Sequence, residues 1–313
     1  MLDATTIATC ADARELVRTL YGARTLHKKA TVIGSAENVG PSDQWLFPAE
    51  RWAGLEAKAK ERLKQFMPQT SNALLPVPTA LVLNRVFGLG RHARQAERQF
   101  SFPYGKATVT YTGPELRQFD ARVLFALYEM SKRVPFGMPV AFRPSEVLRI
   151  MNTQPTGYYY DELEAAIRRL QVSLICIKFS VHSERSSFEV QLLGKREWKA
   201  GDPRGQAWIH IDREVRQLFG AGYTTIPLAL RMSLPDGLVS WLATMLCAIG
   251  NKSADLKFPV SSLQASCGSN AGIRDFRKSL HRAFKQLLQN GVISQYTVRR
   301  DCNSIEVVSV AMA

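Results

Sequence analysis

The side chains with the clearest capacity for chemistry gather in one short segment near the C-terminal end of the sequence. Residues 274–285 carry basic groups three or four positions apart, so an α-helix would bring them onto one face. Lysine and arginine neutralise phosphates, and arginine can also donate two hydrogen bonds to guanine. The pattern indicates a nucleic-acid-binding surface made by Arg274, Arg277, Lys278, His281, Arg282 and Lys285.

The opposite side of this segment is apolar, which determines how the helix must sit. Its spacing predicts a helix over residues 273–290 that packs on its own domain through one stripe. A helix over 261–266 and a glycine-containing turn precede it, and strands over 292–299 and 304–310 follow. Helix, turn, helix and hairpin is the order of a winged helix. The residues of the stripe are Ile273, Phe276, Leu280, Phe284 and Leu287.

Position within this helix-turn-helix predicts which groups read bases and which hold phosphates. The second helix of such a pair lies in the major groove with its N-terminal residues at the base edges. We therefore expect Asn270, Arg274 and Lys278 to read bases. The phosphate contacts are expected from the remaining basic groups of the face, Arg277, Arg282 and Lys285.

The turn before this helix and the hairpin after it extend the same surface. Backbone N–H groups around Ser269 and the helix N-terminus suit a phosphate. Arg299 and Arg300 lie at the tip between the last two strands, where they are expected to touch the DNA backbone or the minor groove. The alternative interpretation is that this basic face is an ordinary solvated helix surface.

The charge of the whole chain favours a polyanionic partner. The sequence has 41 Lys and Arg against 27 Asp and Glu, a net charge of +14 and a pI near 9.8. The counts are 10 basic and 8 acidic groups in residues 1–73, 19 and 12 in 74–211, and 12 and 7 in 212–313. The excess therefore belongs to the last two segments, and nucleic acid is the expected partner.

The middle of the chain repeats the same plan with different chemistry. Strand signals at 99–103 and 107–111 precede a helix expected from Gly113-Pro114, and a short helix, a turn and a helix over 158–171 lead into two strand-like runs. Acidic residues occupy early exposed positions of the last helix, and they repel phosphate. The groups left to contact DNA are Tyr158, Arg168, Arg169 and Lys178, and contacts to protein are the alternative for this part.

These patterns predict an α+β protein with two tandem winged-helix domains. We expect an N-terminal extension over residues 1–73 that is partly flexible, a first domain over 74–211 and a second domain over 212–313 that is the main DNA reader. A stretch near 199–222 is expected to connect the two domains, with residues 212–219 as a bridging helix.

Several ordered segments resemble one known family. The run CGSNAGIRDFRKSLHRAFKQLLQNGVI, together with YTGPELRQFDARVLFALYEMSKR, FGMPVAF and GYYYDELEAAIRRL, resembles the TrfA-type plasmid replication initiators over about residues 74–310. The resemblance implies a protein that binds directly repeated origin sequences (iterons) in double-stranded DNA, opens A+T-rich DNA and recruits the host replicative helicase and initiator. It also implies a monomer–dimer equilibrium and major readout by Arg274, Arg277, Lys278 and His281.

The resemblance raises a further partner, the host sliding clamp. Family members often bind it through a Gln-Leu-Ser/Asp-Leu-Phe type peptide in the N-terminal extension. Here Gln44, Trp45, Leu46 and Phe47 form a similar segment that is one residue short of that spacing. The alternative is an aromatic peptide folded back onto its own protein.

The sequence offers little support for catalysis, a metal or a membrane. The five histidines are scattered, the five cysteines form no C-x-x-C pair, and the longest apolar run is too short to span a bilayer. Tyr158-Tyr159-Tyr160 opens an amphipathic helix and is explained by packing, and Gly250–Ser253 lacks the spacing of a phosphate-binding loop. We expect a protein of the reducing bacterial cytoplasm, with no enzymatic activity, cofactor or metal.

Two other functions fit the same DNA-binding surface. A winged-helix transcriptional repressor would use it on an operator. A partition or chromatin-like protein would bind with little discrimination between sites.

Overall fold

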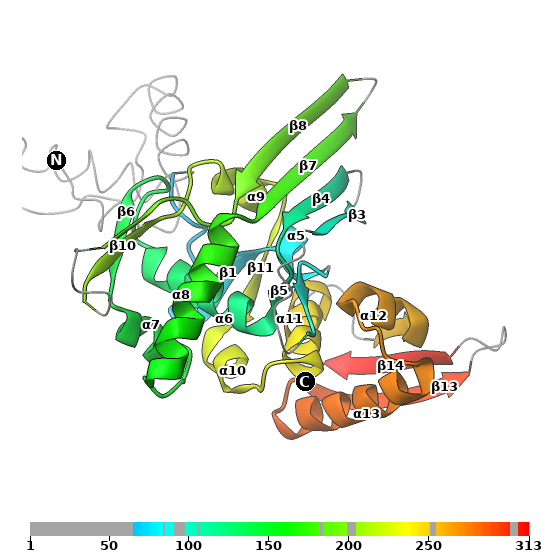
Figure 1. Cartoon of the computed structure of the whole chain (residues 1–313). Coiled ribbons are helices and arrows are strands. Elements are labelled where there is room, and N and C mark those ends of the chain that lie inside the picture. The colour runs from blue at the N-terminus through cyan, green and yellow to red at the C-terminus, as the bar shows by residue number, and fades with distance from the viewer. Residues whose placement is uncertain are drawn as a thin grey trace, which may run out of the picture.

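The computed structural model describes residues 65–83, 85–90, 98–104, 107–181, 184–198, 205–250, 255–300 and 306–312. Its described part is a mixture of helices and mainly antiparallel strands arranged around two hydrophobic cores (Figure 1). Met67 to Met232 supply the first core, and Leu234 to Val310 supply the second. Within these residues no helix is long and apolar enough to cross a membrane.

The first half is built on the long helix α6. Its elements are β1 (Leu74–Pro78), α5 (Thr79–Val82), β2 (Phe87–Gly88), β3 (Arg98–Tyr104), β4 (Ala107–Gly113), β5 (Leu116–Arg117), α6 (Gln118–Ser131), β6 (Pro139–Phe142), α7 (Pro144–Ile150), α8 (Gly157–Gln171), β7 (Leu174–Val181), β8 (Glu184–Gln191), β9 (Arg196–Trp198), β10 (Ala207–His210), α9 (Val215–Gly220), β11 (Tyr223–Pro227) and α10 (Leu228–Ser233).

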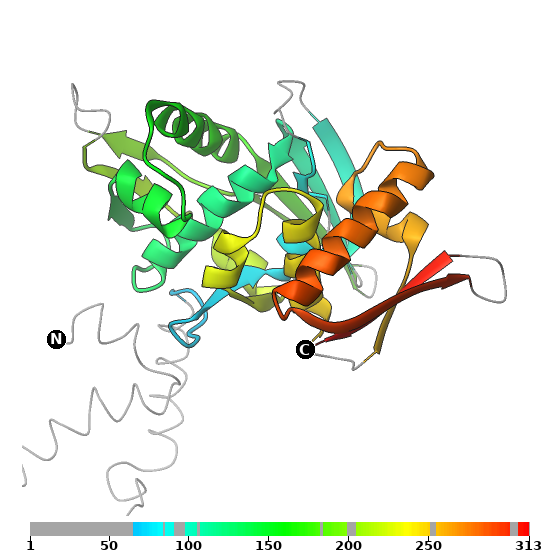
Figure 2. The same ribbon diagram turned by 90° about the horizontal axis from the view of Figure 1, so that it is seen from below.

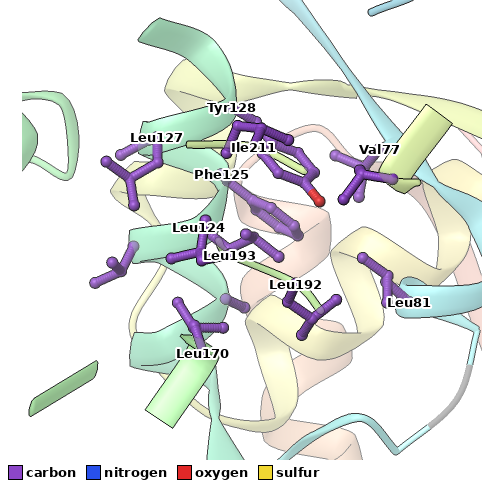
Figure 3. Close-up of a cluster of buried hydrophobic side chains, with 14 of the residues drawn as sticks. Val77, Leu81, Leu124, Phe125, Leu127, Tyr128, Leu170, Leu192, Leu193 and Ile211 are labelled. Atoms are coloured by element: carbon purple, nitrogen blue, oxygen red, sulfur yellow. The ribbon is translucent and has the colours of Figure 1, made fainter. Parts of the chain in front are cut away.

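Other elements cover helix α6 on several sides, and most of its side chains are therefore apolar. Residues Val123 to Tyr128 are all buried, as expected for a helix at the centre of a core. Figure 3 shows its side chains meeting residues from β1, α5, α8 and the segments after β8 and β10. The labelled residues there are Val77, Leu81, Leu124, Phe125, Leu127, Tyr128, Leu170, Leu192, Leu193 and Ile211.

The strands of the first half form small sheets around this helix. Within the described residues the largest sheet has the antiparallel order β3-β4-β7-β8, and its β7–β8 ribbon projects from the body (Figure 1). A second sheet has the order β6-β10-β9. The pairs β1–β11, antiparallel, and β2–β5, parallel, join segments far apart in the sequence.

The start of α6 differs from the prediction. A helix was expected from Gly113-Pro114, but Leu116 and Arg117 form β5, and the helix begins at Gln118. The backbone N–H of Arg117 donates to Oδ2 of Asp120 at 2.7 Å, which caps the helix end. The pairing of β5 with β2 is non-local, so a local pattern cannot reveal it.

The second half has the element order of a winged helix. It contains α11 (Leu238–Gly250), β12 (Asp255–Pro259), α12 (Val260–Cys267), α13 (Ile273–Gln289), β13 (Ile293–Arg300) and β14 (Glu306–Met312). The strands form an antiparallel sheet of order β12-β14-β13. Figure 2 shows the orange helix α13 lying alongside the red β13–β14 ribbon.

The two cores divide the chain later than residue 211. Val215, Leu218 and Phe219 of α9 belong to the first core, and β11 pairs with β1, so residues 212–233 belong to the first half. At the other end Met67 is buried in the first core, so part of the expected extension is folded. The amphipathic sequence of α9 predicts that one face of the helix is buried, but it does not predict which of the two cores that face joins.

Candidate nucleic-acid interface

Helix α13 buries one face and exposes the other, as its sequence predicts. Phe276, Leu280, Phe284 and Leu287 are fully buried in the second core. Ile273 was expected in this stripe but is 45% exposed. The residue opens the helix before its first full turn, where the core no longer reaches it.

The predicted basic groups lie together on the open side of α13. Arg277 is half-buried at the border of the apolar stripe. Nζ of Lys278 lies 3.3 Å from Oδ1 of Asp275, and both side chains are exposed. Such a surface ion pair holds little free energy, so Lys278 remains able to meet a phosphate or a base. The exposed basic side chains are Arg274, Lys278, His281, Arg282 and Lys285.

The turn between α12 and α13 is braced by side chains. Gly268 ends α12 in the left-handed region, with φ of 69°. Nε2 of Gln264 donates to the carbonyl oxygen of Ala271 at 2.6 Å, which ties α12 to the turn. Asn270 is exposed and Ser269 half-buried, so the predicted turn contacts lie at the surface. The sequence did not single out Gln264, because a glutamine in an amphipathic helix carries no specific signal.

The β13–β14 ribbon is attached to α13 through an aromatic contact. Tyr296 stacks on Phe284 with ring centres 5.2 Å apart, and His281 lies 6.0 Å from the same tyrosine ring. Arg299 is exposed near the end of β13. Arg300 ends β13, and its side chain lies outside the described part of the structure. The ribbon therefore carries at least one basic group and holds the ring of His281 against it.

The first half places its predicted contacts at the two ends of α8 and on β7. Tyr158, at the start of α8, is 69% exposed and lies edge-on against Tyr159. Arg168 is exposed and pairs with Glu164 at 2.7 Å. Lys178 is exposed in the middle of β7. These three side chains are available at the surface but do not form one cluster comparable to the face of α13.

Arg169 does not have the position expected of a DNA contact. Its side chain is 15% exposed, and Nη2 lies 2.7 Å from Asp120 and 2.9 Å from Glu162. Burial would lower the pKa of Arg169, but its bonds to Asp120 and Glu162 raise it above the ordinary value. Arg169 holds α8 against the N-terminus of α6. The sequence did not reveal this role, because Asp120 is distant in the chain.

An open cleft lies at the turn between α7 and α8, which occupies the helix-turn-helix position of the first half. Its volume is about 530 Å³, and Asn152 beside it has φ of 51°. Arg143 and Arg149 line it, both exposed, together with Glu146. These two arginines add positive charge near the turn. They were not among the predicted contacts, because they lie outside the predicted recognition helix.

The predicted partner-binding segment cannot be compared with the structure. Gln44, Trp45, Leu46 and Phe47 lie outside the part of the chain that the structure describes. Among the described side chains, no group of three His, Cys, Asp or Glu residues is arranged to hold a metal ion.

The exposed basic helix, its braced turn and the adjoining ribbon are the features of a winged-helix DNA-binding protein. The chain belongs to the TrfA protein family, whose model matches residues 77–305. A curated relative, the plasmid replication initiator protein TrfA of Escherichia coli, is 24% identical over 198 residues, which are 62% of this chain and 50% of that protein. The chain therefore matches half the length of this relative.

Solved structures support the fold at low sequence identity. The crystal structure of RctB domains 2-3 has a TM-score of 0.53 and 10% identity, covering 74% of this chain and 96% of that one. A selenomethionine derivative of domains 2 and 3 of RctB has a TM-score of 0.54 and 12% identity, covering 75% and 98%. The similarity extends over both halves because it covers about three quarters of this chain.

Proposed function

We propose that this protein initiates plasmid replication by binding directly repeated origin sequences in double-stranded DNA. The observation that carries the proposal is the exposed basic face of α13 on a braced helix-turn-helix, in a chain of the TrfA family. Two tandem winged-helix units, one in each half, would contact one repeat. The order α6, β6, α7, α8, β7, β8 in the first half supports the tandem arrangement.

The chemistry of the proposed role is positioning, without catalysis. Binding to adjacent repeats would concentrate protein beside an A+T-rich segment, promote its opening and recruit the host helicase and initiator. A monomer–dimer equilibrium would regulate how many repeats are filled, and the sliding clamp is a further host partner to test. The E. coli relative, named as a plasmid replication initiator protein, supports this role.

The first experiment is footprinting of the purified chain on its own plasmid's origin region, with permanganate to detect unpaired thymines. We expect regular protection over direct repeats and reactive thymines in the neighbouring A+T-rich segment. Protection confined to an inverted repeat at a promoter, without melting, would instead support a repressor. Equal affinity for origin and random DNA would support a partition or chromatin-like protein, since a specific binder discriminates by about 10³-fold or more.

A further inference from the structure

A buried arginine lies at the junction of the two halves. Arg231, on α10, is 1% exposed, and its Nη2 donates to Oε1 of Gln118 at 2.9 Å. Oγ of Ser240, on α11, lies 3.3 Å from the same Oε1 and 3.0 Å from the carbonyl oxygen of Gly237, so its one hydroxyl hydrogen is shared between these two acceptors. Nε2 of Gln118 in turn donates to the carbonyl oxygen of Phe87 at 2.8 Å. One buried amide at the start of α6 thus connects the first core with α10 and α11.

These bonds lie where the chain passes from one core to the other. Met232 belongs to the first core and Leu234 to the second, so α10 ends at the connection itself. A second contact reinforces the junction, because Nη1 of Arg122 on α6 lies 3.1 Å from Oδ2 of Asp236, just before α11. The angle between the halves is therefore held by directional bonds in addition to apolar packing.

Stability alone gives a weak explanation for an arginine at this place. Burial lowers the pKa of Arg231 to about 10, which shows the cost of removing its charge from water. Its Nε and Nη1 have no hydrogen-bond partner among the described residues, although the guanidinium lies 5.7 Å from the ring centre of Phe125. Apolar side chains of similar volume often replace buried polar groups without loss of stability. The presence of an arginine here is better explained by the fixed geometry of its hydrogen bonds, which position α10 relative to α6.

The junction also lies beside the start of α8, the helix in the recognition position of the first half. A cleft of about 240 Å³ is lined by Tyr158 of α8, by Gln118, and by Asp236 and Gly237 at the entry to the second half. A rotation of one half about this junction would therefore move α8 relative to α13.

We infer that Arg231 is a positioning residue for DNA recognition: through Gln118 and Ser240 it fixes the angle between the halves, so that α8 and α13 meet DNA at one spacing. The inference rests on the proposed function, since both halves must contact one site. One inserted base pair turns part of the site by about 35° around the helix axis. A rigid pair of units then loses contacts, whereas a pair with a loose junction can follow the DNA.

The test measures binding of the full chain to its repeat and to a series of repeats with one base pair inserted at successive steps. Wild-type protein is expected to lose about tenfold or more in affinity for insertions between the two contacted segments. The variant Arg231→Met/Gln118→Leu replaces the polar pair with apolar groups. For this variant, the affinity lost when a base pair is inserted should shrink to about threefold or less. A variant that keeps the full penalty overturns the inference.

A matched control makes the same Arg→Met substitution away from the junction. The side chain of Arg196 is 7% exposed and lies 3.9 Å from Glu164 within the first half, so Arg196→Met should keep the full insertion penalty. A control that relaxes the penalty equally would show that general loosening suffices, which also overturns the inference. Melting curves followed by circular dichroism establish that each variant is folded.

Other outcomes separate failure of this inference from failure of the proposed function. If the double variant does not fold, Ser240→Ala decides, because it removes the contacts of the Ser240 hydroxyl with Gln118 and with the backbone of Gly237 and leaves Arg231 with its acceptor. If an insertion then costs at least about twofold less affinity than in the wild type, the inference is supported. An unchanged loss of affinity overturns it. Insertions that cost the wild type nothing would overturn it while repeat protection still supported the proposed function. Absence of repeat protection would remove the proposed function itself.

Discussion

At the scale of single residues, α13 carries basic groups whose different positions imply different effects on DNA binding. Arg274 lies in the first turn, where a recognition helix reaches base edges, and Lys285 lies three turns later, where we expect a contact to the DNA backbone. Arg274→Ala should cost about 1–3 kcal/mol at the cognate repeat and little on random DNA. Lys285→Ala should weaken both equally and lower the salt slope by about one. Titrations on both DNAs at several salt concentrations measure this, and equal losses for Arg274→Ala would show a phosphate contact.

The exposed Ile273 leads to a second residue-scale prediction. It stands beside Arg274 at the start of α13, and aliphatic groups at this position can contact the C5-methyl group of thymine. Replacing the contacted thymine with uracil removes that methyl and should lower affinity about threefold to fourfold. Ile273→Ala should bind both DNAs equally. If uracil at each thymine of the repeat costs both proteins the same, Ile273 reads no methyl group.

Two buried tyrosines should respond to Phe substitution with opposite signs. The Tyr128 hydroxyl has no hydrogen-bond partner among the described residues, whereas the Tyr111 hydroxyl bonds Ser173 at 2.9 Å and the carbonyl oxygen of Pro114. Tyr128→Phe should therefore raise the free energy of unfolding by about 1 kcal/mol, and Tyr111→Phe should lower it by a similar amount. Urea denaturation at neutral pH measures both changes, and a destabilised Tyr128→Phe would reveal an unrecognised hydrogen bond.

The same tyrosines set an alkaline pH dependence. Burial raises the pKa of Tyr128 above its ordinary value of 10.0, so above pH 10 the unfolded chain releases a proton that the folded chain keeps. Stability therefore falls as pH rises, by up to about 1.4 kcal/mol per pH unit for each such group. Tyr128→Phe removes one of these groups, so the stability of the variant should fall less steeply with pH. An unchanged slope would contradict the effect of burial on the pKa of Tyr128.

The residues of the candidate site were predictable where one helix determines them. A 3.6-residue period separates the apolar from the basic side of α13, and the structure has the same division, with Ile273 as the exception at the helix end. Arg169 was not predictable in the same way. Its surroundings depend on Asp120 of α6, and no local pattern reveals a partner that only folding brings within 2.7 Å.

At the scale of elements, the α12–α13 turn depends on one glycine conformation. Gly268 has φ of 69°, and a Cβ there would meet Arg85 at an ordinary 3.5 Å, so backbone strain is the cost of a side chain. Gly268→Ala should lower stability by about 1–2 kcal/mol and weaken repeat binding, because α13 begins from this turn. Gly220→Ala, on α9 with open space around it, should stabilise by up to about 1 kcal/mol. Thermal melting and repeat titrations measure both variants, and a fully stable Gly268→Ala would show that the turn tolerates another conformation.

Elements with strong local periodicity were predicted with nearly correct bounds. The expected helices over 158–171 and 273–290 correspond to α8 and α13, and the final hairpin corresponds to β13 and β14. The short pairs β1–β11 and β2–β5 were missed. Their strands have only two to five residues, too few for a clear pattern in the sequence, and their pairing depends on segments brought together by the core.

At the scale of the whole molecule, the two cores should unfold together. Leu83 and Leu230 pack against the second core, Cys247 packs against the first, and Oγ of Thr224 donates to the carbonyl oxygen of Cys247 at 3.0 Å. Loss of either core would therefore expose apolar surface and unpaired polar groups on the other. This shared boundary implies one cooperative transition.

A cavity in the second core tests that cooperativity. Phe284 is fully buried there, and Phe284→Ala should cost about 3–5 kcal/mol, whereas Leu288→Ala on the exposed side of the same helix should cost much less. Because the cores share a boundary, the large loss should speed hydrogen exchange in α6 of the first core as well as in α13. Exchange followed by mass spectrometry on both variants measures this. If α13 loses protection while α6 keeps it, the halves unfold independently, and the junction around Arg231 then sets their angle without coupling their stability.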